Sequence, residues 1–286
     1  MNFRNILCGI LWDLKHKNKL EKPKIYDCFL FFNELELLKL RFQELYDHVD
    51  YFVIGEATKT HSGKDKELYF LKNKQKFKKW QDKIIHVIIK DTPKIKNNDR
   101  WELEGYQKNQ IRKGLNKCNN NDIILFSDAD EIPNYKKIPE ALELLKTNKV
   151  VLFKQRFYYY YLNGFLNNCW MGTVACKFKT LKYKCGCSLK QLRVMRRDQE
   201  LKYIENGGWH FSYLASPEKI QEKISSFAHN EYDTEEYNTL EKIKNRIEKG
   251  EDLFGRYQKV NYVKIDETFP ETIIKNKEKY SSLIKA

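Results

Sequence analysis

The sequence predicts an α/β fold, in which a mostly parallel sheet carries flanking helices and is followed by a helical C-terminal part. Short apolar runs rich in β-forming residues alternate with segments whose apolar residues recur at helical spacing. This alternation is typical of parallel sheets with helices on their faces. With 286 residues, of which 41% are hydrophobic and 14% aromatic, the chain is able to bury a large core, and disorder is excluded as the default.

Four strands are predicted in the first half of the chain, with a helix after the first strand and another before the fourth. Asn33 is predicted to cap the first helix, with Glu36 three residues later as in a capping box. The second helix is expected around residues 101–117. The predicted strands cover residues 24–32, 49–56, 83–89 and 122–127.

The second half of the chain is predicted to contain a long strand and then helices. Residues 150–162, "VVLFKQRFYYYYL", form the strand. Ser216 followed by Pro217 predicts a helix start, because these residue types are preferred at the cap and at the first helical position. Thr234 is predicted to start another helix, which Gly250 ends.

The charge of the chain is strongly positive and unevenly distributed. Lys and Arg number 53 and Asp and Glu 39, which gives a formal net charge of +14. No acidic residue occurs in residues 144–197. This balance favours an acidic partner, namely nucleic acid, an anionic membrane surface or a phosphorylated ligand. A Lys-rich composition that serves solubility is the alternative.

Cysteine usage and the N-terminus give weaker indications. The seven cysteines are an odd number, which excludes a complete disulfide framework. The apolar segment "ILCGILW" (6–12) is shorter than the about 20 residues that span a bilayer, and it lacks a small-residue cleavage site. With no signal peptide or transmembrane segment seen, the sequence predicts a cytoplasmic protein or one peripheral on a membrane.

An acidic cluster, "SDADEIP" (127–133), follows the fourth apolar strand. Asp128 and Asp130 are two residues apart, so their side chains point to the same side of an extended chain. Ligands of such sheets bind beyond the carboxyl ends of the strands. Paired carboxylates there suit Mg²⁺ or Mn²⁺, which stabilise the charge of a departing diphosphate. Glu131 beside them is a further catalytic candidate. An acidic turn without function is the alternative.

Three blocks in order resemble glycosyltransferase family 17. They are "IYDCFLFFNELELLKLRFQELYDHVDYFVIGEATKTHSGK" (25–64), "SDADEIP" (127–133) and "GGWHFSYL" (207–214). The resemblance implies a GT-A-like nucleotide-sugar-binding fold, a divalent cation, Mn²⁺ or Mg²⁺, and transfer with inversion. The resemblance covers the predicted GT-A-like domain over 24–232. The sequence on either side is predicted to form an N-terminal extension over 1–23 and a helical C-terminal extension over 233–286 packed on the same domain.

The resemblance also implies roles for individual residues. Asp128 and Asp130 match its D-x-D motif, with Asp130 on the metal, and Lys108 stands where relatives often carry Arg. The two glycines before Trp209 predict a tight turn with a close backbone approach, so that a constrained loop delivers His210 as a metal or diphosphate contact. The predicted donor-binding residues are Glu56, His61, Lys64, Asn109 and Asp128.

The general base that inversion requires is left open by the sequence. A histidine is one candidate, although His229, within "SFAHNEY", is predicted to lie on a helix and pack. The carboxylate candidates are Glu56, Glu102, Glu104, Glu131, Asp198 and Glu205.

The predicted function is metal-dependent inverting transfer of a sugar, GlcNAc from UDP-GlcNAc, to a glycan, glycoprotein or glycolipid hydroxyl. Nucleic acid is not an expected partner, while a peripheral membrane contact is allowed. One alternative is a basic nucleic-acid-binding protein or metal nuclease, although the chain has no helix-turn-helix, zinc-finger or RRM pattern. The other is a carbohydrate-binding protein without catalysis.

Overall fold

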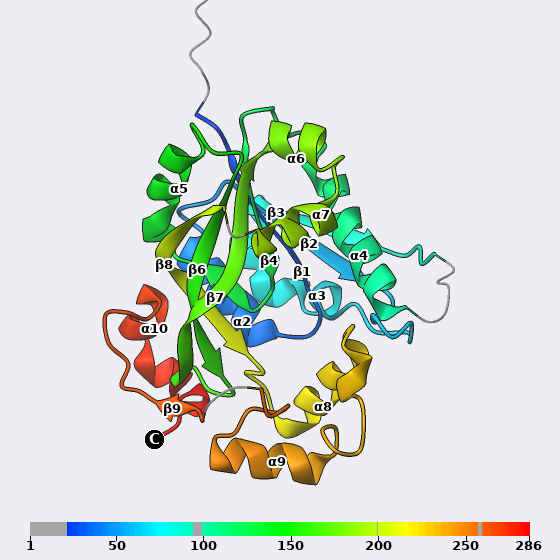
Figure 1. The fold of residues 1–286 in the computed structure, drawn as a ribbon, viewed down its shortest axis with the longest axis vertical. Coiled ribbons are helices and arrows are strands. Elements are labelled where there is room, and N and C mark those ends of the chain that lie inside the picture. The colour runs from blue at the N-terminus through cyan, green and yellow to red at the C-terminus, as the bar shows by residue number, and fades with distance from the viewer. Residues whose placement is uncertain (1–21, 94–98, 199, 257–258) are drawn as a thin grey trace, which may run out of the picture.

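The computed structural model describes residues 22–93, 99–198, 200–256 and 259–286. These residues form a nine-stranded sheet in the order β3-β2-β1-β4-β7-β6-β8-β5, with β9 beside β7 (Figure 1). Every strand except β5 and β7 runs in the same direction, so the mostly parallel α/β class is confirmed. The strands are β1 (Ile25–Leu30), β2 (Tyr51–Ala57), β3 (Ile84–Ile89), β4 (Ile123–Asp128), β5 (Glu131–Pro133), β6 (Val150–Tyr159), β7 (Gly164–Lys177), β8 (Lys202–Ser212) and β9 (Asn261–Tyr262).

Helices cover both faces of the sheet, and a third group lies beyond one end of it. On the first face lie α2 (Leu35–Leu45), α3 (Tyr69–Lys72), α5 (Ile138–Leu144), α10 (Glu271–Lys275) and the 3₁₀ segment η1 (Lys74–Lys83). On the second face lie α4 (Arg100–Gln110), α6 (Phe178–Lys184), α7 (Leu189–Val194) and the 3₁₀ segment η3 (Ile111–Leu115). The third group contains α8 (Pro217–Ser226) and α9 (Leu240–Lys249). The remaining 3₁₀ segments are η4 (Tyr135–Lys137), η5 (Met195–Arg197), η6 (Asn230–Tyr232) and η7 (Lys277–Leu283).

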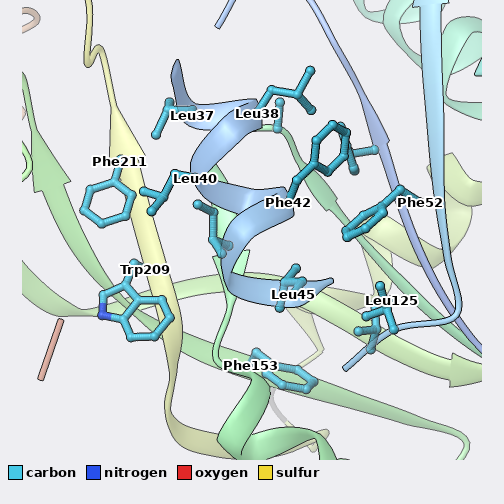
Figure 2. Packing of buried hydrophobic residues seen from close by; sticks show 14 of the residues in the cluster. Leu37, Leu38, Leu40, Phe42, Leu45, Phe52, Leu125, Phe153, Trp209 and Phe211 are labelled. Carbon is cyan, nitrogen blue, oxygen red and sulfur yellow. The ribbon is translucent and has the colours of Figure 1, made fainter. Parts of the chain in front are cut away.

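Helix α2 anchors the first face of the sheet. Phe42 and the helix's leucines after Leu35 recur at helical spacing and are almost fully buried. Figure 2 shows Leu40 beside Trp209 and Phe211 of β8, with Phe42 facing Phe52 of β2. The Phe42 and Phe52 rings lie 4.7 Å apart at 60°. Because the helix touches strands from both halves of the sheet, its position fixes the halves relative to each other.

Strand β1 shows how the two covered faces divide the side chains. Ile25 and Phe29 point to the α2 face, while Tyr26 and Cys28 point to the α4 face. Asp27 lies on the α2 face and is fully buried. A carboxylate in that position needs a charged partner, and helix α2 provides it.

The predicted cap of the first helix is wrong. Helix α2 begins at Leu35, and Glu34 rather than Asn33 occupies the cap position. The Asn33 amide is instead used in a long-range contact, donating to the Glu222 carboxylate of α8 at 3.0 Å. The tertiary contact therefore overrides the local capping preference.

Two predictions near the C-terminus also change. Helix α9 begins at Leu240 after Thr239, whose Oγ1 accepts from the Lys242 amide at 3.4 Å, so the start at Thr234 is wrong. The end at Gly250 is confirmed, with a left-handed φ of 64°. His229 does not lie in an α-helix: α8 ends at Ser226, and His229 precedes η6.

The two ends of the chain differ in what the structure describes. Residues 1–21, which hold "ILCGILW" and nearly all of the predicted extension, lie outside the described residues. The segment after residue 232 contains strand β9 as well as helices, and Glu44 of α2 accepts from the Glu271 and Thr272 amides at 3.2 and 3.0 Å. In the described ranges, none of the helices is both long and apolar enough to cross a bilayer.

Candidate active site

A cavity of about 640 Å³ opens beyond the carboxyl ends of β1, β2 and β4. Its walls also include side chains from α4, α7, β8 and α8, and its volume is typical of a small-molecule site. Both aspartates of "SDADEIP" line it: Asp128 is the last residue of β4, and Asp130 follows two residues later. The predicted position of the acidic cluster at the strand end is therefore confirmed.

Arg41 holds the acidic turn from inside the protein. Its guanidinium is fully buried and binds Asp27 through two bonds of 2.7 and 2.6 Å. It also donates to the backbone carbonyls of Asp128 (3.1 Å) and Glu131 (2.9 Å) and to Ser127 Oγ (2.7 Å). A guanidinium has enough donors in a fixed plane to bind all of these acceptors at once. The turn is thus positioned before any ligand arrives.

Asp128 lies between two cations. Its Oδ1 is 3.2 Å from Lys108 Nζ of α4, and its Oδ2 is 2.9 Å from Arg193 Nη2 of α7. Burial would raise the pKa of Asp128, but Arg193 and Lys108 hold it well below its ordinary value. The side chain keeps 40% of its surface exposed, so the charged group still faces the cavity.

Asp130 has a different set of partners. Its Oδ2 accepts from Lys223 Nζ of α8 at 3.0 Å, and its Oδ1 lies 3.5 Å from His210 Nε2. Lys223 is also 3.0 Å from Glu34. Burial opposes ionisation of Asp130, yet Lys223 and His210 together lower its pKa. Asp130 is therefore a charged, nearly buried carboxylate with one oxygen directed at the histidine.

His210 is brought to the cavity by a strand, which corrects the predicted delivery by a loop. It lies in β8, opposite Glu131 of β5, and stacks between Phe157 and Trp170 with centroids 4.6 and 4.2 Å away. Its Nδ1 is buried and has no hydrogen-bond partner among the described residues. The close backbone approach expected at the glycines is present at Gly208, where φ is +147° and an added Cβ would lie 2.2 Å from the Ile132 carbonyl oxygen.

Glu131 is placed as a support for the site. Its carboxylate is fully buried and accepts from the Asp128 amide at 3.0 Å and from Trp170 Nε1 at 2.7 Å. It also forms an ion pair with Arg193 and lies 3.6 Å from Arg196. These partners occupy both carboxylate oxygens, and Glu131 is not part of the cavity wall. The geometry favours a structural role over the predicted catalytic one.

Glu56 does not line the cavity, and its carboxylate binds structural partners instead. The carboxylate is fully buried and accepts from the Phe70 and Leu71 amides at 2.7 and 3.2 Å. His86 Nε2 lies 3.0 Å from the same group. The Glu56 carboxylate therefore stabilises the start of α3.

The other predicted donor-binding residues divide into two groups. Asn109 accepts through Oδ1 from Ser188 Oγ and from the Lys190 amide, both at 3.0 Å, and so joins α4 to α7. Lys64 is exposed and lies outside the cavity wall. His61 lines the cavity, and burial lowers its pKa. Of the five residues, the structure brings His61 and Asp128 together in the cavity.

A divalent cation fits one place in this cavity. Asp130 Oδ1 and His210 Nε2 converge, while Lys223 occupies the opposite Oδ2. A carboxylate oxygen and an imidazole nitrogen are both suitable ligands for Mn²⁺. Among the described residues no group of three or more His, Cys, Asp or Glu side chains forms a metal site. Ions of this class often bind through one or two protein ligands and complete their shell with phosphate oxygens and water.

The basic segment of residues 144–197 contributes several cations to the cavity wall. Arg193 and Arg196 are directed at Glu131. Lys190 and Arg197 line the same wall, and within the described part of the chain neither forms an ion pair. Their charge therefore remains available for an anionic ligand.

Comparisons with known proteins give low but significant similarity to one kind of enzyme. The human β-1,4-mannosyl-glycoprotein 4-β-N-acetylglucosaminyltransferase is 31% identical over 107 residues, which is 35% of this chain and 20% of the human protein. The rat protein of the same name gives the same values. This chain thus spans about a fifth of the length of the curated relatives that it matches.

Two solved structures resemble the fold more distantly. One is the S. aureus TarS fragment 1–349, with 13% identity, a TM-score of 0.38, and coverage of 70% of this chain and 63% of that chain. The other is the mannosyltransferase PcManGT from Pyrobaculum calidifontis in complex with GDP-Man and Mn²⁺, with 12% identity, a TM-score of 0.42, and coverage of 85% and 78%. The model of glycosyltransferase family 17 matches residues 4–283. Since this match spans nearly the whole sequence, the chain belongs to glycosyltransferase family 17 and is a glycosyltransferase.

Proposed function

We propose that this glycosyltransferase moves GlcNAc from UDP-GlcNAc to a hydroxyl group of a glycan, glycoprotein or glycolipid, with Mn²⁺ or Mg²⁺ held by Asp130 and His210. The observation that carries the proposal is the convergence of Asp130 Oδ1 and His210 Nε2 at 3.5 Å inside a cavity of about 640 Å³. The names of the relatives support GlcNAc as the sugar.

The cation would supply positive charge where the diphosphate leaves. The chain adds cations of its own on the cavity wall. Lys223 is fixed between Asp130 and Glu34, and Lys190 and Arg197 line the wall without ion-pair partners among the described residues. Charged groups that are fixed before the reaction stabilise a transition state without reorganising.

Asp128 has a separate role in this proposal. Its carboxylate is held by Lys108 and Arg193 on two sides and remains partly exposed to the cavity. We assign it to a hydroxyl of the donor, such as those of the ribose, because a charged carboxylate is a strong hydrogen-bond acceptor. Arg41 fixes the backbone on which both aspartates stand.

The test is UDP or GDP release from a panel of UDP-sugars and GDP-sugars with Mn²⁺, before and after addition of EDTA. Release from UDP-GlcNAc that EDTA abolishes is the expected result. Asp130→Asn should lower turnover by at least about 100-fold, the scale of losing one strong electrostatic stabiliser. The variant should stay folded because Lys223 keeps Glu34 as a partner.

Asp82→Asn is the matched control. Asp82 is an exposed aspartate that accepts from the Tyr46 hydroxyl outside the cavity, and its substitution should leave turnover unchanged. The metal site would be rejected if the wild-type protein were fully active in EDTA, or if Asp130→Asn were fully active with Mn²⁺. Preference for a GDP-sugar would reject UDP-GlcNAc as the donor.

A further inference from the structure

The rim of the cavity carries an aromatic pair that the donor site does not use. Trp101 of α4 is 41% exposed, although most large apolar side chains of the described chain are buried. The ring of His229 stands against it with centroids 4.4 Å apart and planes at 83°. Both residues line the same cavity as Asp130. An exposed indole face is a suitable surface for the C–H face of a sugar ring.

His229 is oriented by a carboxylate. Its Nδ1 lies 2.6 Å from Glu231 Oε1, and its side chain keeps 40% of its surface exposed. When Nδ1–H donates to the carboxylate, Nε2 is left with a lone pair that is able to accept a proton. A base held by a third group in this way is the arrangement by which enzymes activate hydroxyl nucleophiles.

The two sides of the rim are tied together. Arg100, next to Trp101, donates to the Phe227 carbonyl at 3.3 Å and lies 3.3 Å from Asp233. Asp233 also accepts from Ser225 Oγ at 3.2 Å. The loop after α8 is thereby bound to the first turn of α4, so Trp101 and His229 keep a fixed relation.

The carboxylates of the cavity wall are poor candidates for the base. Asp128 and Asp130 each face two basic groups. Glu34 is paired with Lys223, and Glu104 with Lys108, each at 3.0 Å. In each of these carboxylates, an ion pair with a basic side chain already engages at least one oxygen.

The remaining histidines of the wall are His61 and His210. His210 faces Asp130, and His61 lies on the loop after β2, against Glu104 and Lys108. We propose that the rim is the acceptor site, in which a sugar ring lies on Trp101 and His229, oriented by Glu231, is the general base. This inference rests on the proposed glycosyl transfer.

The acceptor oxygen bonds to the anomeric carbon of the donor sugar while the bond from that carbon to the diphosphate oxygen breaks. The bonding pair leaves with UDP, and the hydroxyl proton passes to His229 Nε2. Glu231 stabilises the imidazolium that forms, and solvent then removes the proton.

The experiment measures UDP release from UDP-GlcNAc with Mn²⁺ and p-nitrophenyl β-D-mannopyranoside as the acceptor probe. His229→Ala should lower kcat by about 10²–10⁴-fold, the usual contribution of a general base, while the donor Kd stays unchanged. Added imidazole should restore turnover with saturation. Glu231→Gln should lower kcat with little change in KM, whereas Trp101→Ala should raise the acceptor KM about tenfold.

His48→Ala is the control, because His48 is exposed and stacks on Tyr135 at 3.8 Å outside the cavity. It should keep wild-type kinetics. If His229→Ala keeps the wild-type kcat, or if imidazole does not restore the lost turnover, His229 is not the general base. If Trp101→Ala leaves the acceptor KM unchanged, the acceptor sugar does not lie on Trp101. Failure of the proposed function looks different: the wild-type protein itself would neither bind UDP-GlcNAc nor release UDP.

Discussion

Arg41→Met tests whether a buried guanidinium holds the acidic turn. The substitution leaves Asp27 as an unpaired charge in a fully buried position, and breaking such a pair costs about 3–5 kcal/mol. The carbonyls of Asp128 and Glu131 and the hydroxyl of Ser127 lose donors as well, at about 0.5–1.5 kcal/mol for each bond. These terms overlap, so we expect a loss of about 4–6 kcal/mol, a large share of the 5–15 kcal/mol typical of a domain.

The assay is urea unfolding, monitored by tryptophan fluorescence. The change in the free energy of unfolding is taken from the shift of the midpoint, with the slope of free energy against urea concentration held constant. Asp27→Leu combined with Arg41→Met removes both charges and should recover at least about 2 kcal/mol relative to Arg41→Met alone. Arg112→Met, at an exposed arginine, should stay within about 0.5 kcal/mol of wild type. A loss below about 1 kcal/mol for Arg41→Met, or no recovery in the double variant, would refute the reasoning.

Two more predictions concern charge. Lys223 and His210 lower the pKa of Asp130 in the folded protein against the effect of burial. The ionised Asp130 carboxylate therefore stabilises the fold above the ordinary carboxyl pKa of about 4, and this stabilisation is lost as the pH falls through the pKa of the folded state. In EDTA, the unfolding free energy of Asp130→Asn should therefore fall less steeply on acidification than that of wild type; parallel curves would contradict the ion pair. Arg197→Gln should raise the KM for UDP-GlcNAc several-fold and flatten its rise between about 50 and 200 mM salt, whereas an unchanged salt response would mean that Arg197 faces only solvent.

The parallel part of the sheet was predictable because each strand is a short apolar run covered on both faces. Strands β1 to β4 begin and end within two residues of the predicted ranges. The D-x-D position followed from the same pattern, since Asp128 and Asp130 come directly after the buried run of β4. The family prediction is confirmed by the match over residues 4–283, and with it the prediction of a glycosyltransferase.

The groups that neutralise the aspartates were not predictable in the same way. Lys108 and Lys223 lie on separate helices, and nothing local to them indicates which strand end they approach. The sequence did indicate that Arg41 needs a buried partner. It follows Leu37 and Leu38 by four and three residues and so lies on the apolar stripe of α2, where a charge requires a buried partner.

Several predictions that used a single local rule were overturned by the structure, although the helix end at Gly250 was confirmed. Asn33 and Thr234 both have side chains that suit a helix cap, but Asn33 is used by Glu222 of α8 and the helix start lies at Leu240 after Thr239. His229 looked like a helical packing residue, yet α8 ends before it. For Asn33, a contact distant in sequence decides the outcome.

The pairing of β5 with β8, which sets Glu131 opposite His210, affects how the enzyme is made. A ribosome finishes β1, β2 and β4 with both aspartates long before it reaches β8. An interrupted translation product therefore carries the D-x-D motif without His210, and without Lys223 it leaves Asp130 with neither of its partners. Such fragments would lack the second ligand of the proposed metal site, so only a nearly complete chain would carry that site.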